Sequence, residues 1–437
     1  MKKKKLAVKK TLALAVLNHQ KNNFKSAENL YNEVLKIIPN HFETNFLLGS
    51  LLVKTKKFNQ AIQFLNKAIL INPNHVGVYN NLGGALKGLG KDEKAIDCFQ
   101  KVIKINPNHE EAHNNLGIVF NGLGKTQKAI VCFQKVIKIN PNHVEAHNNL
   151  GTVFYELGAR KKAIKYYQKT IQINPNYVAA YWNLHSFAPD IDEALIILKK
   201  ICRIDNKYLK AKLAISALEG FRGNFKNFDS LINSPYANDP FMRSIKWVFS
   251  LPQLPKIFFN RWNFFDAIVS LTDKSRPFYE FGVWNGVSFK YLANIFEMGF
   301  GFDTFTGLPE PWYHEPISKY SSFGSVPKIK GGKFIVGEFK ETLPKFFSKK
   351  RPLASLINFD ADLYSSTLCA LNNSNDVIDK KTILIFDQFL MSEHWEEDEF
   401  KALNEFCDKF NFKYEVLAVS FFSKQVAVKL NKKKKSC

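Results

Sequence analysis

Five prolines in the N-terminal part of the chain recur at a constant spacing of 34 residues: Pro39, Pro73, Pro107, Pro141 and Pro175. The last four each lie in an Asn-Pro-Asn turn. A fixed period of this length is typical of a solenoid, in which each repeat is one small helical unit packed against its neighbours. The proline spacing therefore predicts a stack of helix-turn-helix repeats.

Small and large apolar residues hold fixed places within each period. A glycine or alanine at such a place allows two helices to approach closely, while an aromatic ring fills the neighbouring groove. With these positions assigned, residues 8–177 resemble five tetratricopeptide repeats. The positions are Leu82-Gly83, Leu116-Gly117 and Leu150-Gly151 in the first helices, and Ala95, Ala129 and Ala163 with Phe99, Phe133 and Tyr167 in the second.

The repeat pattern continues in altered form after residue 177. A sixth helix pair starts at Val178, and its turn is shortened around Pro189. Residues 207–234 have the pattern of a degraded repeat that caps the stack. We therefore assign residues 1–234 to the solenoid and the proline- and aromatic-rich residues 235–259 to a connector, followed by a helix over 261–271.

An asparagine recurs at one position of the first helices: Asn81, Asn115, Asn149 and Asn183. In tetratricopeptide repeats this position lines the concave face. By resemblance, this asparagine ladder would hydrogen-bond the backbone of an extended peptide, so we expect a protein or peptide partner. A polar face in contact with water only is the alternative.

From Pro277 onward the pattern changes to short apolar strands alternating with helices. Such alternation predicts a mostly parallel sheet with helical crossovers, here in a Rossmann-like, doubly wound domain over residues 260–431, followed by a basic tail over 432–437. Strands are predicted over 278–281, 299–302, 334–336, 354–359 and 382–386, with a C-terminal hairpin over 414–419 and 425–430. Helices are predicted over 288–296, 338–347, 365–371 and 397–410. The fold class is α plus α/β.

The first of these strands runs into a glycine-spaced turn. Gly282 and Gly286 let the backbone turn sharply and come close to a ligand, and Ser288 is placed to cap the following helix. Glu280 puts an acid where a phosphate site would disfavour one, which suits a cationic ligand such as the sulfonium and amine of S-adenosylmethionine. The second strand ends in Asp303, which could accept both hydroxyls of an adenosine ribose.

Further acids follow the later strands. Asp360 and Asp362 end the fourth strand, and Asp387 and Gln388 end the fifth. Because parallel strands bring their carboxyl ends to one edge, Asp360, Asp387 and Gln388 should meet and offer oxygen ligands to Mg²⁺. The alternative is that these acids only cap strand ends. Asp362 could orient Asp360 instead of binding metal.

With these residues placed, about 150 residues of the second domain resemble the macrocin O-methyltransferase family of class I S-adenosylmethionine-dependent enzymes. The resemblance implies methylation of a hydroxyl on a sugar or glycan-like acceptor, assisted by magnesium. It places Glu280, Gly282 and Ser288 at the methionine part of the cofactor and Asp303 at the ribose. The matching segments lie at 280–288, 302–309, 337–344 and 360–367.

The same resemblance makes Asp360 and Asp387 metal ligands, with Asp360 also close enough to act as the catalytic base. This chain departs from the family at Gln388, where a second acid is usual. The amide oxygen could still coordinate a metal ion, but the change removes a charge. His314 and His394 are alternative bases.

Two other functions fit parts of the pattern. Asp360-x-Asp362 also resembles the D-x-D motif of glycosyltransferases that use nucleotide sugars, and repeat–glycosyltransferase fusions are a known arrangement. A protein-binding scaffold with an inactive methyltransferase domain is the second alternative. Nucleic-acid methylation is not favoured, because the N/D-P-P-Y/F tetrapeptide is missing from the sequence.

The composition bears on the partners of the protein and on its cellular location. The formal net charge is +23, with lysine clusters at both termini, and this is consistent with lysine-rich residue usage or with an anionic partner. None of the six cysteines forms a C-x-x-C pair, so a structural zinc site or a disulfide framework is not expected. No segment is predicted to span a membrane. We therefore expect a cytoplasmic protein.

Overall fold

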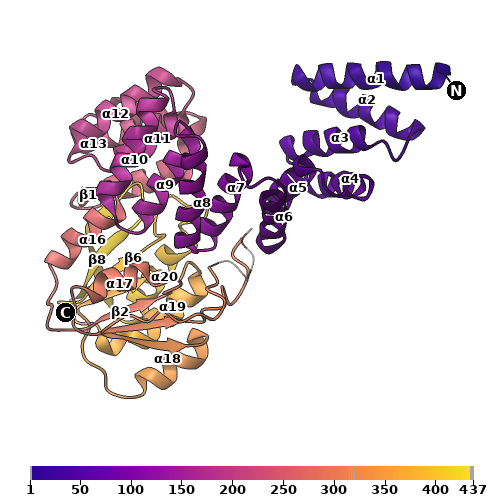
Figure 1. Cartoon of the computed structure of the whole chain (residues 1–437). Helices are drawn as coiled ribbons and strands as arrows, with labels where there is room; N and C mark the ends of the chain where they lie inside the picture. The colour runs from indigo at the N-terminus through magenta and orange to yellow at the C-terminus, as the bar shows by residue number, and fades with distance from the viewer. Residues whose placement is uncertain (1, 314, 316, 318–319, 434–437) are drawn as a thin grey trace. The chain divides into compact units, whose positions relative to one another are not determined.

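The structure is a computed structural model that describes residues 2–313, 315, 317 and 320–433. The chain divides into two compact units, Met1–Val153 and Phe154–Cys437. Figure 1 labels the helices and strands of both.

The first unit consists of helices that pair in chain order, α1 with α2, α3 with α4, α5 with α6 and α7 with α8 (Figure 1). This confirms the predicted repeats of two helices each. The helices are α1 Lys2–Gln20, α2 Phe24–Ile37, α3 Phe42–Lys54, α4 Phe58–Ile71, α5 Val76–Gly88, α6 Asp92–Ile105, α7 Glu110–Gly122, α8 Thr126–Ile139 and α9 Val144–Glu156, which runs into the second unit.

Close contact between the paired helices explains the fixed glycines. A Cβ atom added to Gly83 would lie 2.6 Å from the ring of Phe99, and one added to Gly117 would lie 2.7 Å from the ring of Phe133. Both rings are almost completely buried. The glycine therefore leaves the space that the aromatic ring of the second helix occupies.

A histidine at the N-terminus of successive first helices was not singled out from the sequence. His75, His109 and His143 each precede such a helix, and the imidazole Nδ1 accepts a hydrogen bond from the backbone N–H three residues later, at 3.1–3.3 Å. These bonds satisfy one of the N–H groups that a helix start leaves without an intrahelical partner. The same local hydrogen bond thus caps the first helix of each of these three repeats.

The second unit begins with the remaining helical pairs. The helices are α10 Arg160–Ile173, α11 Val178–His185, α12 Ile191–Ile204, α13 Leu209–Phe221, α14 Lys226–Ile232, the 3₁₀ helix η1 Pro235–Asn238 and α15 Pro240–Phe249. The prediction of a shortened turn around Pro189 was wrong: the turn between α11 and α12 spans residues 186–190, against 157–159 in the preceding pair, and it is helix α11 that is short, with 8 residues against 13 in α9.

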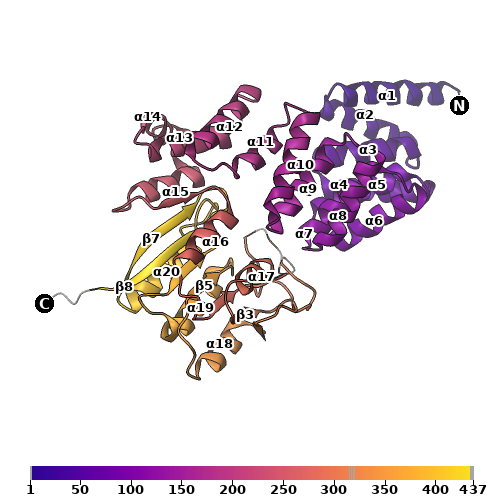
Figure 2. The same ribbon diagram turned by 60° about the vertical axis from the view of Figure 1, so that its left-hand side comes forward.

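An eight-stranded sheet follows, in the order β1-β7-β8-β6-β5-β2-β3-β4. Figure 2 labels β3, β5, β7 and β8 of this sheet. All its strands run in one direction except β8, which is antiparallel to both β6 and β7. The strands are β1 Lys256–Phe258, β2 Phe278–Phe281, β3 Gly299–Asp303, β4 Gly332–Val336, β5 Leu356–Phe359, β6 Ile383–Phe386, β7 Phe412–Ser420 and β8 Val426–Lys432.

This topology confirms the predicted mixed, mostly parallel sheet with a C-terminal antiparallel hairpin. Strand β1 was not predicted, because its three residues lie in the stretch interpreted as a connector. The hairpin also has an unexpected place: β8 lies between β6 and β7, so the last strand is an internal one. Only pairing across the sheet decides that order.

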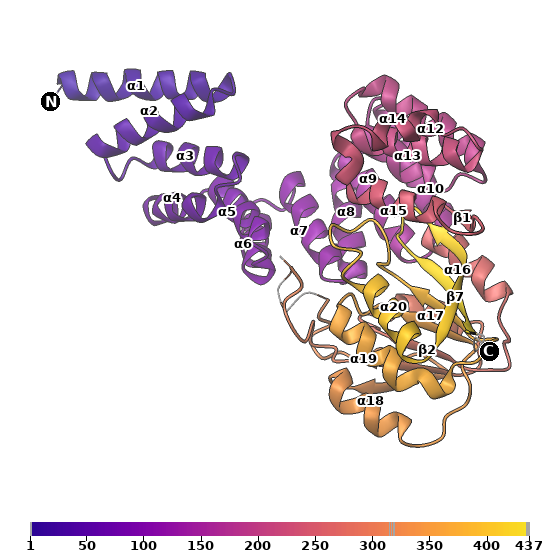
Figure 3. The ribbon, with the colours of Figure 1, turned by 180° about the vertical axis from the view of Figure 1, so that it is seen from behind.

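Helices cover both faces of the sheet. One face packs against α18 Phe339–Phe347, α19 Tyr364–Ser374 and α20 Glu399–Lys409, seen from behind in Figure 3. The other face packs against α16 Arg261–Ser270 and α17 Val287–Ala293. Successive side chains of a pleated strand point to opposite faces of the sheet, so alternate residues pack in the two cores. In β2, for example, Tyr279 and Phe281 belong to the first core and Phe278 to the second.

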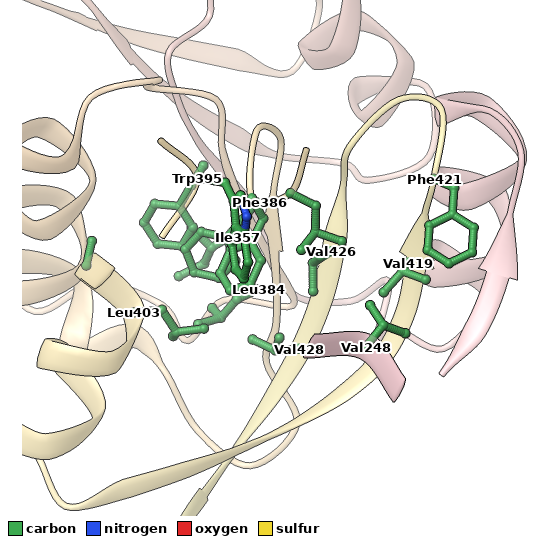
Figure 4. Close-up of a cluster of buried hydrophobic side chains, with 14 of the residues drawn as sticks. Val248, Ile357, Leu384, Phe386, Trp395, Leu403, Val419, Phe421, Val426 and Val428 are labelled. Carbon is green, nitrogen blue, oxygen red and sulfur yellow. The ribbon is translucent and has the colours of Figure 1, made fainter. Parts of the chain in front are cut away.

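The first core extends beyond the sheet and its helices. Val248 of α15 lies in the same buried cluster as Leu384 of β6 and Leu403 of α20 (Figure 4). Phe221 of α13 packs edge-on against Phe421, with ring centroids 5.2 Å apart. The last helical pairs, the segment around α15 and the sheet therefore share one hydrophobic core within the second unit.

Among the described residues, no helix has the length and apolar character needed to cross a membrane.

Candidate active site at the carboxyl ends of the strands

The order of the strands marks one place where a ligand can enter. From β2 the sheet grows through β3 to β4 on one side, and through β5 to β6 on the other. The loops after β2 and β5 therefore leave the sheet toward opposite sides, and the crevice at such a switch point is the usual ligand site of an open parallel sheet. The residues after β1 and in the β7–β8 turn reach the same edge.

The loops after β2 and β5 approach so closely that only glycine fits between them. Gly282 has φ +90°, and a Cβ atom there would lie 1.9 Å from the backbone oxygen of Asp360. Gly286 has φ +74° and is the residue directly before α17. Both glycines of the predicted turn thus have backbone conformations that residues with a Cβ atom rarely adopt.

Glu280 lies on β2 and is completely buried. Its Oε1 accepts a hydrogen bond from the Ser288 hydroxyl at 2.9 Å, while Oε2 has no hydrogen-bond partner among the described residues. Burial raises the pKa of Glu280 to about 8, against the opposing effects of the hydroxyl of Ser288, the neighbouring amide of Asn358 and the positive charge of Arg261. An acid with one unpaired oxygen in a buried site is ready to accept a hydrogen bond from a ligand.

The prediction that Ser288 caps the helix was wrong. Helix α17 begins at Val287, and Gly286 is its capping residue. The hydroxyl of Ser288 instead orients the Glu280 carboxyl, which lies eight residues earlier.

Asp303 ends β3 and holds the turn after β2. Its Oδ2 accepts hydrogen bonds from the backbone N–H groups of Val283 and Trp284, both at 2.7 Å, and its Oδ1 accepts one from Phe305 at 2.6 Å. Burial raises the pKa of Asp303, and these backbone hydrogen bonds act against that shift. Asp303 therefore shapes the glycine turn directly, and any contact with a ribose would add to these bonds.

Asp360 and Asp387 are close enough to interact, as the adjacent strands predicted. Burial raises the pKa of Asp360 well above its ordinary value, and the charge of Asp387 acts in the same direction. A third group stands with them that the sequence analysis did not include. The guanidinium of Arg261, the first residue of α16, forms an ion pair with Asp387 Oδ2.

Further oxygens of two of the predicted metal ligands, Asp387 and Gln388, are also engaged. Asp387 Oδ1 accepts a hydrogen bond from the Gln425 amide at 2.6 Å, and the side-chain oxygen of Gln388 accepts one from the Lys424 ammonium at 3.5 Å. Within the described part of the chain, no group of three or more His, Cys, Asp or Glu residues could hold a metal ion. The arrangement of donors does not fit the Mg²⁺ site expected from the strand ends.

Asp362 and Glu399 extend the acidic cluster. Burial raises the pKa of Asp362 to about 8, with Asp387 acting in the same direction and the charges of Arg261 and Lys424 against it. Glu399, at the start of α20, accepts a hydrogen bond from the Gln388 backbone N–H at 3.0 Å. Burial raises its pKa well above the ordinary value as well. The raised pKa values favour the protonated acids, and the charges of Arg261 and Lys424 offset the negative charge of those that ionise. Both effects reduce the repulsion between the acids.

Aromatic side chains from the turn after β2 and from the segment after β3 lie near this region. The rings of Trp284 and Tyr320 are 5.5 Å apart, and burial together with the charges of Asp362 and Asp360 raises the pKa of Tyr320. Tyr313 stacks on His394 at 4.2 Å and donates a hydrogen bond to Asp398 at 3.1 Å. His394 is thus partly buried against Tyr313. His314 lies outside the described residues.

The most important groups that the sequence analysis missed are Arg261, Lys424 and Gln425. Arg261 follows β1, a strand that was not predicted, and the other two lie in the β7–β8 turn. A signal was present for Arg261, because Asn260 before it caps a predicted helix and a helix after a strand places its first residue at the carboxyl edge. Nothing in the sequence indicated that β8 would lie inside the sheet, between β6 and β7.

The asparagine ladder forms hydrogen bonds between neighbouring repeats. The Asn81 amide donates to the Ser50 hydroxyl at 2.5 Å, Asn115 accepts from the Lys87 ammonium at 3.1 Å, and Asn149 donates to Asn114 at 3.1 Å. Asn183 is partly buried in α11. The ladder asparagines of the first unit are thus connected along the stack before any ligand binds.

Comparison with known proteins identifies the repeats. Residues 76–109, 110–143 and 144–177 each match a tetratricopeptide repeat model, and a second tetratricopeptide repeat model matches residues 18–86. None of the curated proteins compared with the chain matches it.

Several solved structures are similar to part of the chain. A crystal structure of MamA is 30% identical, covers 37% of this chain and 94% of its own, and has a TM-score of 0.35. A structure of YrrB, described as a TPR protein with an unusual peptide-binding site, is 23% identical over 39% of this chain and 88% of its own, with a TM-score of 0.34. A tetratricopeptide repeat protein from Parabacteroides merdae is 15% identical over 55% of this chain and 97% of its own, with a TM-score of 0.45.

Proposed function

We propose that this chain, whose N-terminal part is built of tetratricopeptide repeats, transfers a methyl group from S-adenosylmethionine to a hydroxyl of a sugar or glycan-like acceptor. The repeats would bind a protein or peptide, the activity that the repeat family suggests. The observation that carries the enzymatic part is the Glu280 carboxyl, buried at the switch point of the sheet with Oε2 unpaired.

The residues around Glu280 fit a cofactor with a positive charge. Glu280 offers an unpaired carboxyl oxygen, and a bound cation would favour its ionised form over the protonated one that burial favours in the empty site. The turn between Gly282 and Gly286 brings the backbone close to the same crevice. When bound, S-adenosylmethionine supplies the activated methyl group. The protein's own part is to bind the ammonium and sulfonium through Glu280, to shape the turn through Asp303 and to exclude water from the crevice.

Asp360 is the residue that we assign as the base. Its raised pKa brings the carboxylate nearer to the pH at which a base can both ionise and take up a proton efficiently. Alignment of the acceptor oxygen with the methyl group would supply much of the acceleration. The aromatic rings of Trp284 and Tyr320 give the crevice apolar surfaces next to acids. Such a combination suits the mixed polar and apolar faces of a sugar.

Calorimetric titration of the full chain with S-adenosylhomocysteine tests this proposal. We expect binding in the micromolar range. Glu280→Gln should weaken it by about tenfold or more, since a hydrogen bond to a charged group contributes about 1.5–3 kcal/mol. Asp379→Asn is the matched control. Asp379 also pairs with an arginine, Arg276, but it precedes β6 and so lies at the amino ends of the strands, away from the candidate site.

The glycosyltransferase alternative is tested in the same experiment. Titration with UDP-sugars should produce no binding heat. Binding of a UDP-sugar together with no binding of S-adenosylhomocysteine would replace methyl transfer by glycosyl transfer. Binding of neither ligand would favour the scaffold with an inactive domain.

A further inference from the structure

Arg261 occupies the middle of the acidic cluster. Its guanidinium pairs with Asp387, and its positive charge also interacts with Asp360 and Glu280. Burial disfavours this charge, but the surrounding acids overcome that effect and raise the pKa of Arg261. The group is therefore a permanent cation at the place where three strand ends bring their acids together.

The backbone holds Arg261 in this position independently of its ion pair. Asn260, directly before it, is completely buried and donates a hydrogen bond to the Ser186 backbone oxygen at 2.8 Å. The same side chain accepts a hydrogen bond from the Asn263 N–H at 2.9 Å. In addition, the Trp262 indole donates to the Tyr155 backbone oxygen at 2.7 Å. Arg261 is thus placed by the start of α16 and by the last helical pairs of the same unit.

A divalent cation would have to compete with these groups for its ligands. Asp387 uses one oxygen for Arg261 and the other for Gln425, and the Gln388 oxygen accepts from Lys424. Displacing the guanidinium would break a charge-assisted hydrogen bond and would place a second cation close to Arg261. A guanidinium also cannot give up its charge by losing a proton.

We propose that Arg261 permanently supplies the positive charge that a divalent metal ion would otherwise supply between Asp360 and Asp387, so that this site excludes divalent cations. Arg261 is then a positioning residue that keeps the acids from repelling one another. The exclusion of metal does not depend on the reaction. The further statement that methyl transfer proceeds in chelator rests on the proposed function.

Metal binding can be measured without an acceptor, with Mn²⁺ alone followed by calorimetry and by its electron paramagnetic resonance signal. For the wild-type chain we expect no site tighter than about 1 mM. Arg261→Ala should create one, with affinity increased by about tenfold or more, because the carboxylates of Asp360, Asp362 and Asp387 lose their cation. Arg261→Lys keeps a positive charge at the position and should exclude Mn²⁺ as the wild type does.

Arg276→Ala is the matched control. Arg276 also forms an ion pair with an aspartate, Asp379, at 2.9 Å, but away from the strand-end cluster. Its removal should create no Mn²⁺ site. If Arg261→Ala does not fold, the wild-type measurement still decides: a Mn²⁺ site of about 0.1 mM or tighter that Asp387→Asn abolishes would overturn the proposal.

Titration with S-adenosylhomocysteine separates this proposal from the proposed function. Wild-type chain that binds the cofactor product but not Mn²⁺ supports both. A Mn²⁺ site lost in Asp387→Asn, with intact cofactor binding, overturns only the role of Arg261. Exclusion of Mn²⁺ without cofactor binding leaves the role of Arg261 supported and overturns methyl transfer.

Discussion

A turn glycine of positive φ and a polar side chain in the first unit have different surroundings from their counterparts at the candidate site of the second. In the first unit, Gly90 closes a turn with φ +68°, and a Cβ atom there would meet nothing within 4 Å. In the second, Gly282 also has a positive φ, but a Cβ atom would collide with the Asp360 backbone. Each histidine cap of a repeat bonds three residues along the chain, whereas Arg261 pairs with Asp387, 126 residues away. The repeats are held by contacts between residues close in the sequence, and these contacts recur from repeat to repeat. The candidate site is formed by contacts between segments far apart in the sequence.

Gly282→Ala should have the largest effect of any change that follows from this comparison. The collision with a backbone oxygen and the positive φ together should lower the free energy of unfolding of the second unit by about 3 kcal/mol or more. All six tryptophans lie in residues 154–437, so tryptophan fluorescence during urea unfolding reports this unit. Gly90→Ala, with the same sign of φ but open space, should lower the stability of the first unit by only about 1 kcal/mol, measured by far-ultraviolet circular dichroism because residues 1–153 include no tryptophan. Equal effects of the two changes would contradict the contrast between the units.

The stability of the second unit should fall as pH rises from about 5 to about 8. Glu280 has an ordinary pKa of 4.5 and a folded-state pKa of about 8, so the folded state holds a proton that the unfolded state has lost over this range. Stability is then greatest below the unfolded value and is lost as pH rises through the folded value, by roughly 1.4 kcal/mol per pH unit for one group. Urea unfolding at several pH values, followed by tryptophan fluorescence, measures the slope.

Glu280→Gln should make that slope shallower, since the amide does not titrate. The exposed Glu415, on β7, is the control, and Glu415→Gln should leave the slope unchanged. An unchanged slope in Glu280→Gln would mean that other acids of the cluster carry the pH dependence.

Gly117→Ala tests the packing of the repeats. The added methyl group would meet the ring of Phe133, so we expect a loss of about 1–3 kcal/mol in the stability of the first unit. Gly122, in the same helix, has open space around it, and Gly122→Ala should cost nothing or increase stability by up to about 1 kcal/mol. Thermal unfolding followed by far-ultraviolet circular dichroism measures both.

The smallest effect is expected for Asn115→Ala combined with Asn149→Ala. These changes remove the bond from Lys87 and the bond to Asn114, and each should cost about 1 kcal/mol or less. The same unfolding measurement tests this. A loss of several kcal/mol would show that the ladder mainly stabilises the stack, and would weaken its assignment as a peptide-binding surface.

Most secondary structure could be predicted from the sequence, because period and apolar pattern are local properties. The predicted helix over 261–271 and α16 differ by one residue, and β2 has the predicted bounds. The misses share one cause. Strand β1 has only three residues, and its pairing with β7 joins segments far apart in the chain. Likewise, the hydroxyl of Ser288 could act as a cap or as a partner of Glu280, and only the path of β2 beside α17 selects the second role.

The sequence by itself determined the repeat stack, the mostly parallel sheet and the acids at its strand ends. The stack follows from the 34-residue period, and the sheet and its acids follow from short apolar runs that alternate with helices and end in polar residues. Tertiary structure alone decided what surrounds the acids. The insertion of β8 between β6 and β7 brings the Lys424–Gln425 turn to Gln388 and Asp387, and β1 delivers Arg261 to the same place. Whether an acid binds a metal ion or an arginine depends on which charge lies within a few ångströms, and that distance is a property of the fold.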